Sequence, residues 1–143
     1  MIRESVQVGE RTLELETGRI ANQAHGAVLL REGETVILAT AVYNPAGAPA
    51  ADFLPLTVDH REYMSAVARI PGGFLRREGR SSEREVLASR LCDRSLRPLF
   101  PKAYRLETQV ITTVLSYDVR SDAPVLAMIA AAAALHLSEI PWR

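Results

Sequence analysis

The chain of 143 residues has one cysteine, one lysine and no long apolar run. A lone Cys92 excludes an internal disulfide and a cysteine-based zinc site within one chain, which fits a reducing compartment. The longest apolar run, residues 123–135, has 13 residues, whereas a membrane-spanning helix needs about 20. Residues 1–5 contain no apolar signal segment, and Glu4 argues against a transit peptide. We therefore expect a cytoplasmic protein without a membrane partner.

Charge is balanced over the whole chain but not along it. Lys and Arg total 17, as do Asp and Glu, so the net charge by itself predicts no polyanionic partner. Every cation except Lys102 is an arginine, a residue that favours planar, bidentate contacts with carboxylate or phosphate. Residues 69–97 hold eight arginines against four acids, so this segment carries +4 and the rest of the chain −4.

The first sixty residues have the alternation that is typical of β-strands. We expect strands over residues 12–17, 27–31, 35–42 and 53–58. Residues 31–34 suit a hairpin loop, and residues 44–50 predict an exposed, mobile Pro/Gly loop. Because the last of these strands contains Pro55, it is expected at a sheet edge or a bulge.

The second half of the chain predicts a helix, a strand and a second helix. They are expected from Ser82 to about Arg97, over residues 108–115 and over residues 123–137. Ser82 and Glu85 have the spacing of a capping box, and Pro98 ends the first helix. Asp122 caps the second, which is apolar on nearly every side and therefore expected to be buried. The order of elements predicts one α+β domain.

Residues 74–80 predict a basic loop with an aromatic tip. Its candidate binding residues are Phe74, Leu75, Arg76, Arg77 and Arg80. Cationic side chains beside an aromatic ring, on which a base can stack, are the minimal equipment for binding single-stranded nucleic acid. The alternative is a solvated basic loop that pairs with Glu78 and Asp52.

Three arginines of the following helix share one side with the apolar Leu87. At about 100° per residue, Arg90, Arg94 and Arg97 lie within about 80° of Leu87, so we expect them to point toward the core. Buried guanidinium groups need anionic partners, and Asp93 can reach only Arg90 and Arg97. Either carboxylates elsewhere complete the pairing, or the three arginines form a phosphate or RNA-backbone subsite.

No pattern for bond-breaking chemistry stands out. The three histidines share no metal-ligand spacing, and the serines lie in no nucleophile-elbow pattern. Neither a P-loop nor a G-x-G-x-x-G fingerprint occurs. Asp59, His60 and Glu62 are weak evidence for acid–base catalysis without geometry, and Cys92 lies at a helix-packing position. The residues predict binding, with no catalytic residue and no metal ligand in this chain.

Two motifs resemble a known family. They are Phe74-Leu75-Arg76-Arg77-Glu78-Gly79 and Asp93-Arg94-Ser95-Leu96-Arg97-Pro98-Leu99-Phe100-Pro101. With residues 15–18, 53–58 and 135–142, they closely resemble the polynucleotide phosphorylase family, in its first ribonuclease-PH-like core domain, over essentially the whole chain. Ser81 and Ser95 replace prolines that are usual in the family. The resemblance implies an α+β, ribonuclease PH-like (ribosomal protein S5 domain 2-like) core.

The resemblance also implies an activity. Enzymes of that family degrade RNA processively from its 3′ end by phosphorolysis, release nucleoside diphosphates, and can run backwards as polymerases. They need Mg2+ and assemble as homotrimers around an RNA channel; single-stranded RNA 3′ ends and other RNA-decay proteins are the implied partners. The resemblance assigns Phe74, Leu75, Arg76, Arg77 and Arg80 to the channel constriction, and Arg90, Arg94 and Arg97 to RNA or phosphate handling.

Residues 1–143 are then expected to be a partial first core domain. We expect the chain to lack the second core domain, which holds the family's phosphate- and metal-binding catalytic residues, and the C-terminal RNA-binding domains. We expect Mg2+ and inorganic phosphate to serve the full enzyme and not to bind this chain, which alone is expected to be inactive, with an exposed apolar face and marginal stability or self-association. The alternatives are a non-catalytic RNA-binding fragment and a single-domain ribonuclease PH relative.

Overall fold

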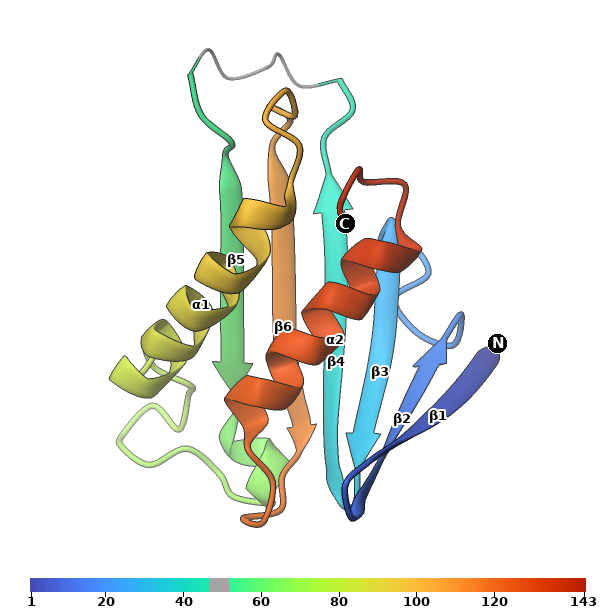
Figure 1. Ribbon diagram of the computed structural model, residues 1–143. Helices are drawn as coiled ribbons and strands as arrows, with labels where there is room; N and C mark the ends of the chain where they lie inside the picture. Colours follow the sequence, from blue (N-terminus) through green and yellow to red (C-terminus); the bar gives the residue numbers. More distant parts are fainter. Residues whose placement is uncertain (47–51) are drawn as a thin grey trace.

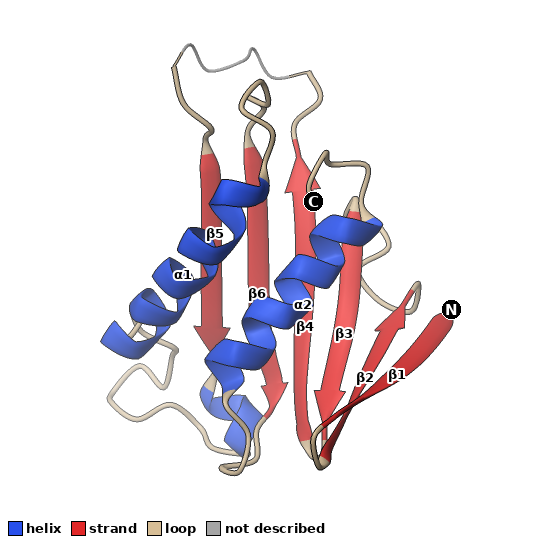
Figure 2. Ribbon diagram, viewed as in Figure 1, coloured by secondary structure: helices blue, strands red, loops and turns tan. Residues whose placement is uncertain are grey.

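The computed structural model describes residues 1–46 and 52–143. It contains one six-stranded sheet, and both helices lie on the same face of that sheet (Figures 1 and 2). The strands are β1 (Ile2–Val8), β2 (Arg11–Thr17), β3 (Gly26–Glu32), β4 (Thr35–Tyr43), β5 (Leu56–Glu62) and β6 (Thr108–Ser116). The helices are α1 (Glu83–Leu96) and α2 (Ala123–Leu137), and short 3₁₀ turns cover Met64–Val67 and Arg97–Leu99. The α+β class is confirmed.

The strands follow the order β1-β2-β3-β4-β6-β5, so β5 forms one edge of the sheet. All neighbours are antiparallel except β5 and β6, which are parallel. Parallel neighbours need a crossover connection, and α1 lies in that connection. The edge position that Pro55 predicts is confirmed. The strand begins only at Leu56, because proline has no amide hydrogen to offer to a ladder.

Most of the predicted strands are confirmed within two residues of their expected ends, and the hairpin over 31–34 turns at Gly33. Strand β1 was not predicted. Each of its residues is exposed, so β1 packs no side chain into the core. Of the loop expected over 44–50, residues 47–50 lie outside the described part of the chain.

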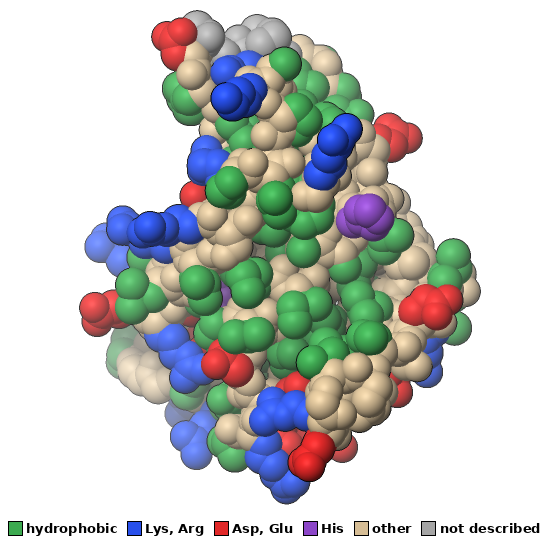
Figure 3. Space-filling model, viewed as in Figure 1, with side chains coloured by type: hydrophobic (Ala, Val, Ile, Leu, Met, Phe, Trp, Pro, Cys, Tyr) green, Lys and Arg blue, Asp and Glu red, His purple; other side chains and the backbone are tan. Residues whose placement is uncertain are grey.

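The core lies between the sheet and the helices. Inward side chains of β3, β4 and β6 alternate with exposed ones, as Leu30, Ile37 and Val110 illustrate. Helix α2 contacts them through a side rich in alanine, but its other side is open, contrary to the expected burial all round. Figure 3 shows apolar side chains on this helical face, and Leu87, Leu91 and Val125 are among the exposed ones. The exposed apolar face that we expected is present.

Within residues 1–46 and 52–143, no helix has the length and hydropathy that a membrane crossing requires.

Close approach of α2 to β3 makes Gly26 sensitive to substitution. A Cβ atom at Gly26 would lie 2.0 Å from the backbone oxygen of Ala134, and a backbone oxygen cannot rotate aside. We predict that Gly26→Ala lowers the free energy of unfolding by about 1–3 kcal/mol or more. Urea unfolding followed by circular dichroism measures this. Gly79→Ala is the control, because its Cβ would meet nothing within 4 Å. Equal stability of Gly26→Ala and the parent would contradict the close approach.

Candidate nucleic-acid interface

The basic loop lies between β5 and α1 and projects from one end of the sheet (Figure 1). Residues 72–84 are all exposed, and the side chain of Phe74 is 100% exposed. Gly73 (φ +89°) and Arg76 (φ +46°) have left-handed backbone conformations, and the Arg76 amide donates to the Gly73 carbonyl oxygen over 3.3 Å. Such conformations are uncommon for residues other than glycine. A tight turn thus presents Phe74 and its neighbouring arginines to solvent.

Hydrogen bonds hold the C-terminal end of this loop against the fold. Glu78 Oε1 accepts from the Met64 amide over 2.8 Å, and Arg61 donates to Ser81 Oγ. The predicted capping box is present at Ser82. In the described residues, the loop arginines form no ion pair with Glu78 or Asp52. The alternative in which these acids neutralise the loop is therefore not observed.

The expected orientation of α1 is wrong. The side of the helix that faces the core carries Glu85, Ala88, Cys92 and Leu96, whereas Leu87 is 60% exposed. The small side chains of Ala88 and Cys92 let the helix lie close to its neighbours, and a leucine side chain can remain exposed on a protein surface. Arg90, Arg94 and Arg97 are accordingly exposed, and the expected need for buried anionic partners does not arise.

Cys92 faces the core, as predicted. Burial raises the pKa of its thiol to about 11, so the thiol remains protonated near neutral pH and is a poor nucleophile.

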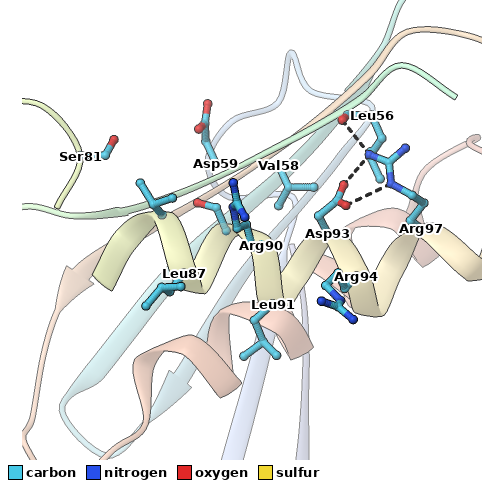
Figure 4. A pocket seen from close by; sticks show the side chains of 12 residues that line it. Leu56, Val58, Asp59, Ser81, Leu87, Arg90, Leu91, Asp93, Arg94 and Arg97 are labelled. Carbon is cyan, nitrogen blue, oxygen red and sulfur yellow. Dashed lines mark hydrogen bonds and ion pairs between the residues drawn. The ribbon is translucent and has the colours of Figure 1, made fainter. Parts of the chain in front are cut away.

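Arg90 and Arg97 line an open hollow of about 930 Å³ between α1 and β5. Figure 4 shows both side chains, with Asp93, on the side of α1 toward β5, whereas Arg94 and Leu87 point away from the strand. Asp93 pairs with Arg97 at 2.7 Å, as its spacing predicts. Its predicted contact with Arg90 is not formed. The three arginines therefore occupy two sides of the helix and do not converge on one point.

The candidate acid–base group at the end of β5 has a structural role. His60 is buried, and its ring nitrogens lie 2.9 Å from Thr112 Oγ1 and 3.2 Å from Glu62 Oε1. Glu62 also pairs with Arg84 at 3.3 Å. These contacts satisfy the ring inside the fold. Among the described residues, no three His, Cys, Asp or Glu side chains gather as a metal site would require.

Comparison with known proteins identifies the family of this chain. Residues 9–141 match the family model described as 3′ exoribonuclease family, domain 1. The chain belongs to this family. It is 55% identical over 141 residues to a polyribonucleotide nucleotidyltransferase of Sorangium cellulosum, covering 99% of this chain and 18% of that protein. Identity to the enzyme of the same name from Caulobacter vibrioides is 54% over 140 residues, covering 98% and 20%. The 3′ exoribonuclease domain thus spans about a fifth of these relatives, in their N-terminal region.

Solved structures share the fold of this 3′ exoribonuclease domain at low sequence identity. Rice (Oryza sativa) Rrp46 matches with a TM-score of 0.70 and 19% identity, over 92% of this chain and 58% of that one. An archaeal exosome core matches with a TM-score of 0.65 and 16% identity, over 96% and 51%. The ribonuclease PH-like fold is confirmed.

The sequence of the 3′ exoribonuclease domain did not predict that Glu85 and Ser89 contact β5. Glu85 Oε1 accepts from the Glu62 amide over 2.9 Å, and Ser89 Oγ accepts from the His60 amide over 2.8 Å. The capping-box motif marks Glu85 in the sequence but gives no sign of this second contact. Burial alone would raise the pKa of Glu85, but hydrogen bonds from the Glu62 and Ser82 amides outweigh it, and its pKa is lowered.

This lowered pKa predicts a pH dependence. A carboxyl group whose pKa is lower in the folded state than in the unfolded state stabilises the fold at pH values above the unfolded-state pKa, here 4.5. This contribution is lost as the pH falls through the folded-state pKa. We predict that Glu85→Gln lowers the free energy of unfolding at pH 7 by about 1 kcal/mol, because a charged acceptor becomes neutral. The difference from the parent should shrink below pH 4.5. Urea unfolding at pH 7 and at stepwise lower pH measures it, with the exposed Glu83→Gln as control. A difference that grows on acidification would contradict this assignment.

Proposed function

We propose that this 3′ exoribonuclease domain supplies RNA contacts in a polyribonucleotide nucleotidyltransferase, a phosphate-dependent 3′→5′ exoribonuclease of the cytoplasm. The proposal is supported by relatives of that name, which are 54–56% identical over at least 96% of this chain. In the reaction, an oxygen of inorganic phosphate attacks the phosphorus of the terminal linkage. The shortened RNA leaves through its 3′ oxygen, and a nucleoside diphosphate is released. The reverse reaction adds nucleotides.

One observation carries the assignment of RNA contacts to this chain. A fully exposed Phe74 stands beside Arg76, Arg77 and Arg80, none of which has an ion-pair partner in residues 1–46 and 52–143. A base stacks on the ring, and the guanidinium groups neutralise phosphates on either side. Arg90 and Arg94 extend this cationic surface along α1. Leu75, 71% exposed, adds an apolar contact to the same strand of RNA.

The chemistry of the proposed enzyme lies outside this chain. Mg2+ would supply charge neutralisation at the reacting phosphates, but no described carboxylate cluster fits such an ion, so we assign no residue of this chain to it. The full enzyme is proposed as a homotrimer around an RNA channel, with the loop of residues 74–80 at its constriction. The exosome structure of Archaeoglobus fulgidus, "with RNA bound to the active site", shares this fold at a TM-score of 0.61, with 18% identity over 96% of this chain and 54% of that one.

A titration tests the division between binding and chemistry. Labelled single-stranded RNA is titrated with the 143-residue chain at several salt concentrations, and phosphate and Mg2+ are then added. We expect binding that weakens with salt, and no release of nucleoside diphosphates. Released diphosphates would show that the catalytic apparatus is in this chain. Failure to bind at low salt would contradict the proposed RNA contacts.

The loop arginines give a prediction of their own. Arg76→Ala combined with Arg77→Ala should weaken RNA binding and reduce the salt slope, d log K/d log[salt], by about 1.4, because each contact to single-stranded phosphate contributes about 0.7. Filter binding or anisotropy at several salt concentrations measures the slope. Lys102→Ala removes an exposed cation in the connection between α1 and β6; it is the control and should leave the slope unchanged. An unchanged slope in the double variant would mean that these arginines face solvent in the complex.

Stacking on the aromatic tip is tested separately. Phe74→Ala should weaken single-strand binding by about 1–3 kcal/mol without changing the salt slope, because the loss is of stacking and not of charge. Phe53→Ala removes another exposed phenylalanine, 65% accessible, and serves as the matched control. Equal affinities of the two variants would remove Phe74 from the proposed contact.

A further inference from the structure

An edge strand leaves a row of backbone N–H and C=O groups without a neighbouring strand. In β5, side chains of α1 take the place of that neighbour. Hydrogen bonds run from the His60 amide to Ser89 Oγ (2.8 Å), from the Glu62 amide to Glu85 Oε1 (2.9 Å), and from Arg97 to the carbonyl oxygens of Leu54 (2.9 Å) and Leu56 (3.2 Å). The helix closes the edge at both ends of the strand.

Arg97 contributes most of this closure at the start of β5. Its Nη1 and Nη2 donate to the two carbonyl oxygens, while Nε and Nη2 donate to Asp93 over 3.0 and 2.7 Å. Four hydrogen bonds occupy a group that has five N–H donors, and the Asp93 carboxylate offsets its charge. Few donors and little net charge remain for a phosphate.

Arg90 and Arg94 differ from Arg97 in this respect. Within the described part of the chain, neither forms a side-chain hydrogen bond or an ion pair, although both lie on the same helix and line the same hollow. The three arginines therefore differ in their contacts. Arg97 bonds to the start of β5, Arg90 lies on the side of α1 toward β5 without a partner among the described residues, and Arg94 points away from the strand (Figure 4).

We propose that Arg97, held by Asp93, is a positioning residue that closes the outer edge of β5 and contacts no phosphate. By joining the end of α1 to the start of β5, it fixes the helix that carries Arg90 and Arg94. Its planar fork is required, because one ammonium group on a flexible stem cannot bridge a carboxylate and two carbonyl oxygens in fixed geometry. The role of Arg90 and Arg94 as phosphate contacts rests on the proposed function, whereas the closure of β5 does not.

Hydrogen–deuterium exchange tests the closure without RNA. Arg97→Gln and Asp93→Asn should each speed amide exchange across residues 54–62 by about tenfold, the factor expected for losing a charged hydrogen bond. Arg97→Lys keeps the charge but should speed exchange as well. Arg94→Gln is the matched control and should leave exchange unchanged. Parent-like exchange in both Arg97 variants would overturn the proposal.

The salt dependence of RNA binding tests the second half of the proposal. Arg97→Gln should weaken binding severalfold and leave the salt slope unchanged, whereas Arg90→Gln and Arg94→Gln should each reduce the slope by about 0.7. A reduction of about 0.7 in Arg97→Gln would show a direct phosphate contact and overturn the proposal. If the parent binds no RNA, the proposed function fails, and the exchange measurement still decides whether Arg97 closes β5.

Discussion

The arrangement of the whole site depends on how the open edge of β5 is satisfied. Helix α1 turns one side, with Ser89, Arg97 and the carboxylate of Glu85, toward that edge, and packs a second side of small residues against the core. Only the third side is left for solvent. Leu87 and Arg94 are exposed because the other two sides of the helix contact β5 and the core. The cationic surface of the helix therefore follows from the need of the β5 backbone for hydrogen-bond partners.

The fold was predictable from sequence wherever a local signal decides the structure. Ser82 and Glu85 specify where α1 begins, Asp122 specifies where α2 begins, and alternating side chains specify the central strands. Strand β1 escaped prediction because it buries no side chain and is joined to β2 through backbone pairing. Its formation depends on pairing with β2, and its short, mostly polar sequence gives no strong signal of a strand.

The candidate site also has a part that the sequence predicts and a part that it does not. The basic loop was predictable, since glycine, phenylalanine and arginine specify an exposed turn through their own chemistry. The orientation of α1 was not, because hydrophobicity alone places Leu87 inside, whereas close packing selected Ala88 and Cys92. The sequence also could not show that Arg97 bonds to β5 whereas Arg94 does not. The difference lies in the carbonyl oxygens of Leu54 and Leu56, about forty residues earlier in the chain.

The zero net charge of the chain conceals how its charges are placed. Six arginines form ion pairs within residues 1–46 and 52–143: Arg3, Arg11, Arg19, Arg84, Arg97 and Arg120. Exposed pairs of this kind add little stability, but each removes a cation from the potential that a distant polyanion meets. Arg76, Arg77 and Arg80 on the loop have no such partner in the described residues, and neither have Arg90 and Arg94. A neutral chain can therefore present a cationic surface, because its acids neutralise arginines elsewhere and leave those of the loop and outer helix uncompensated.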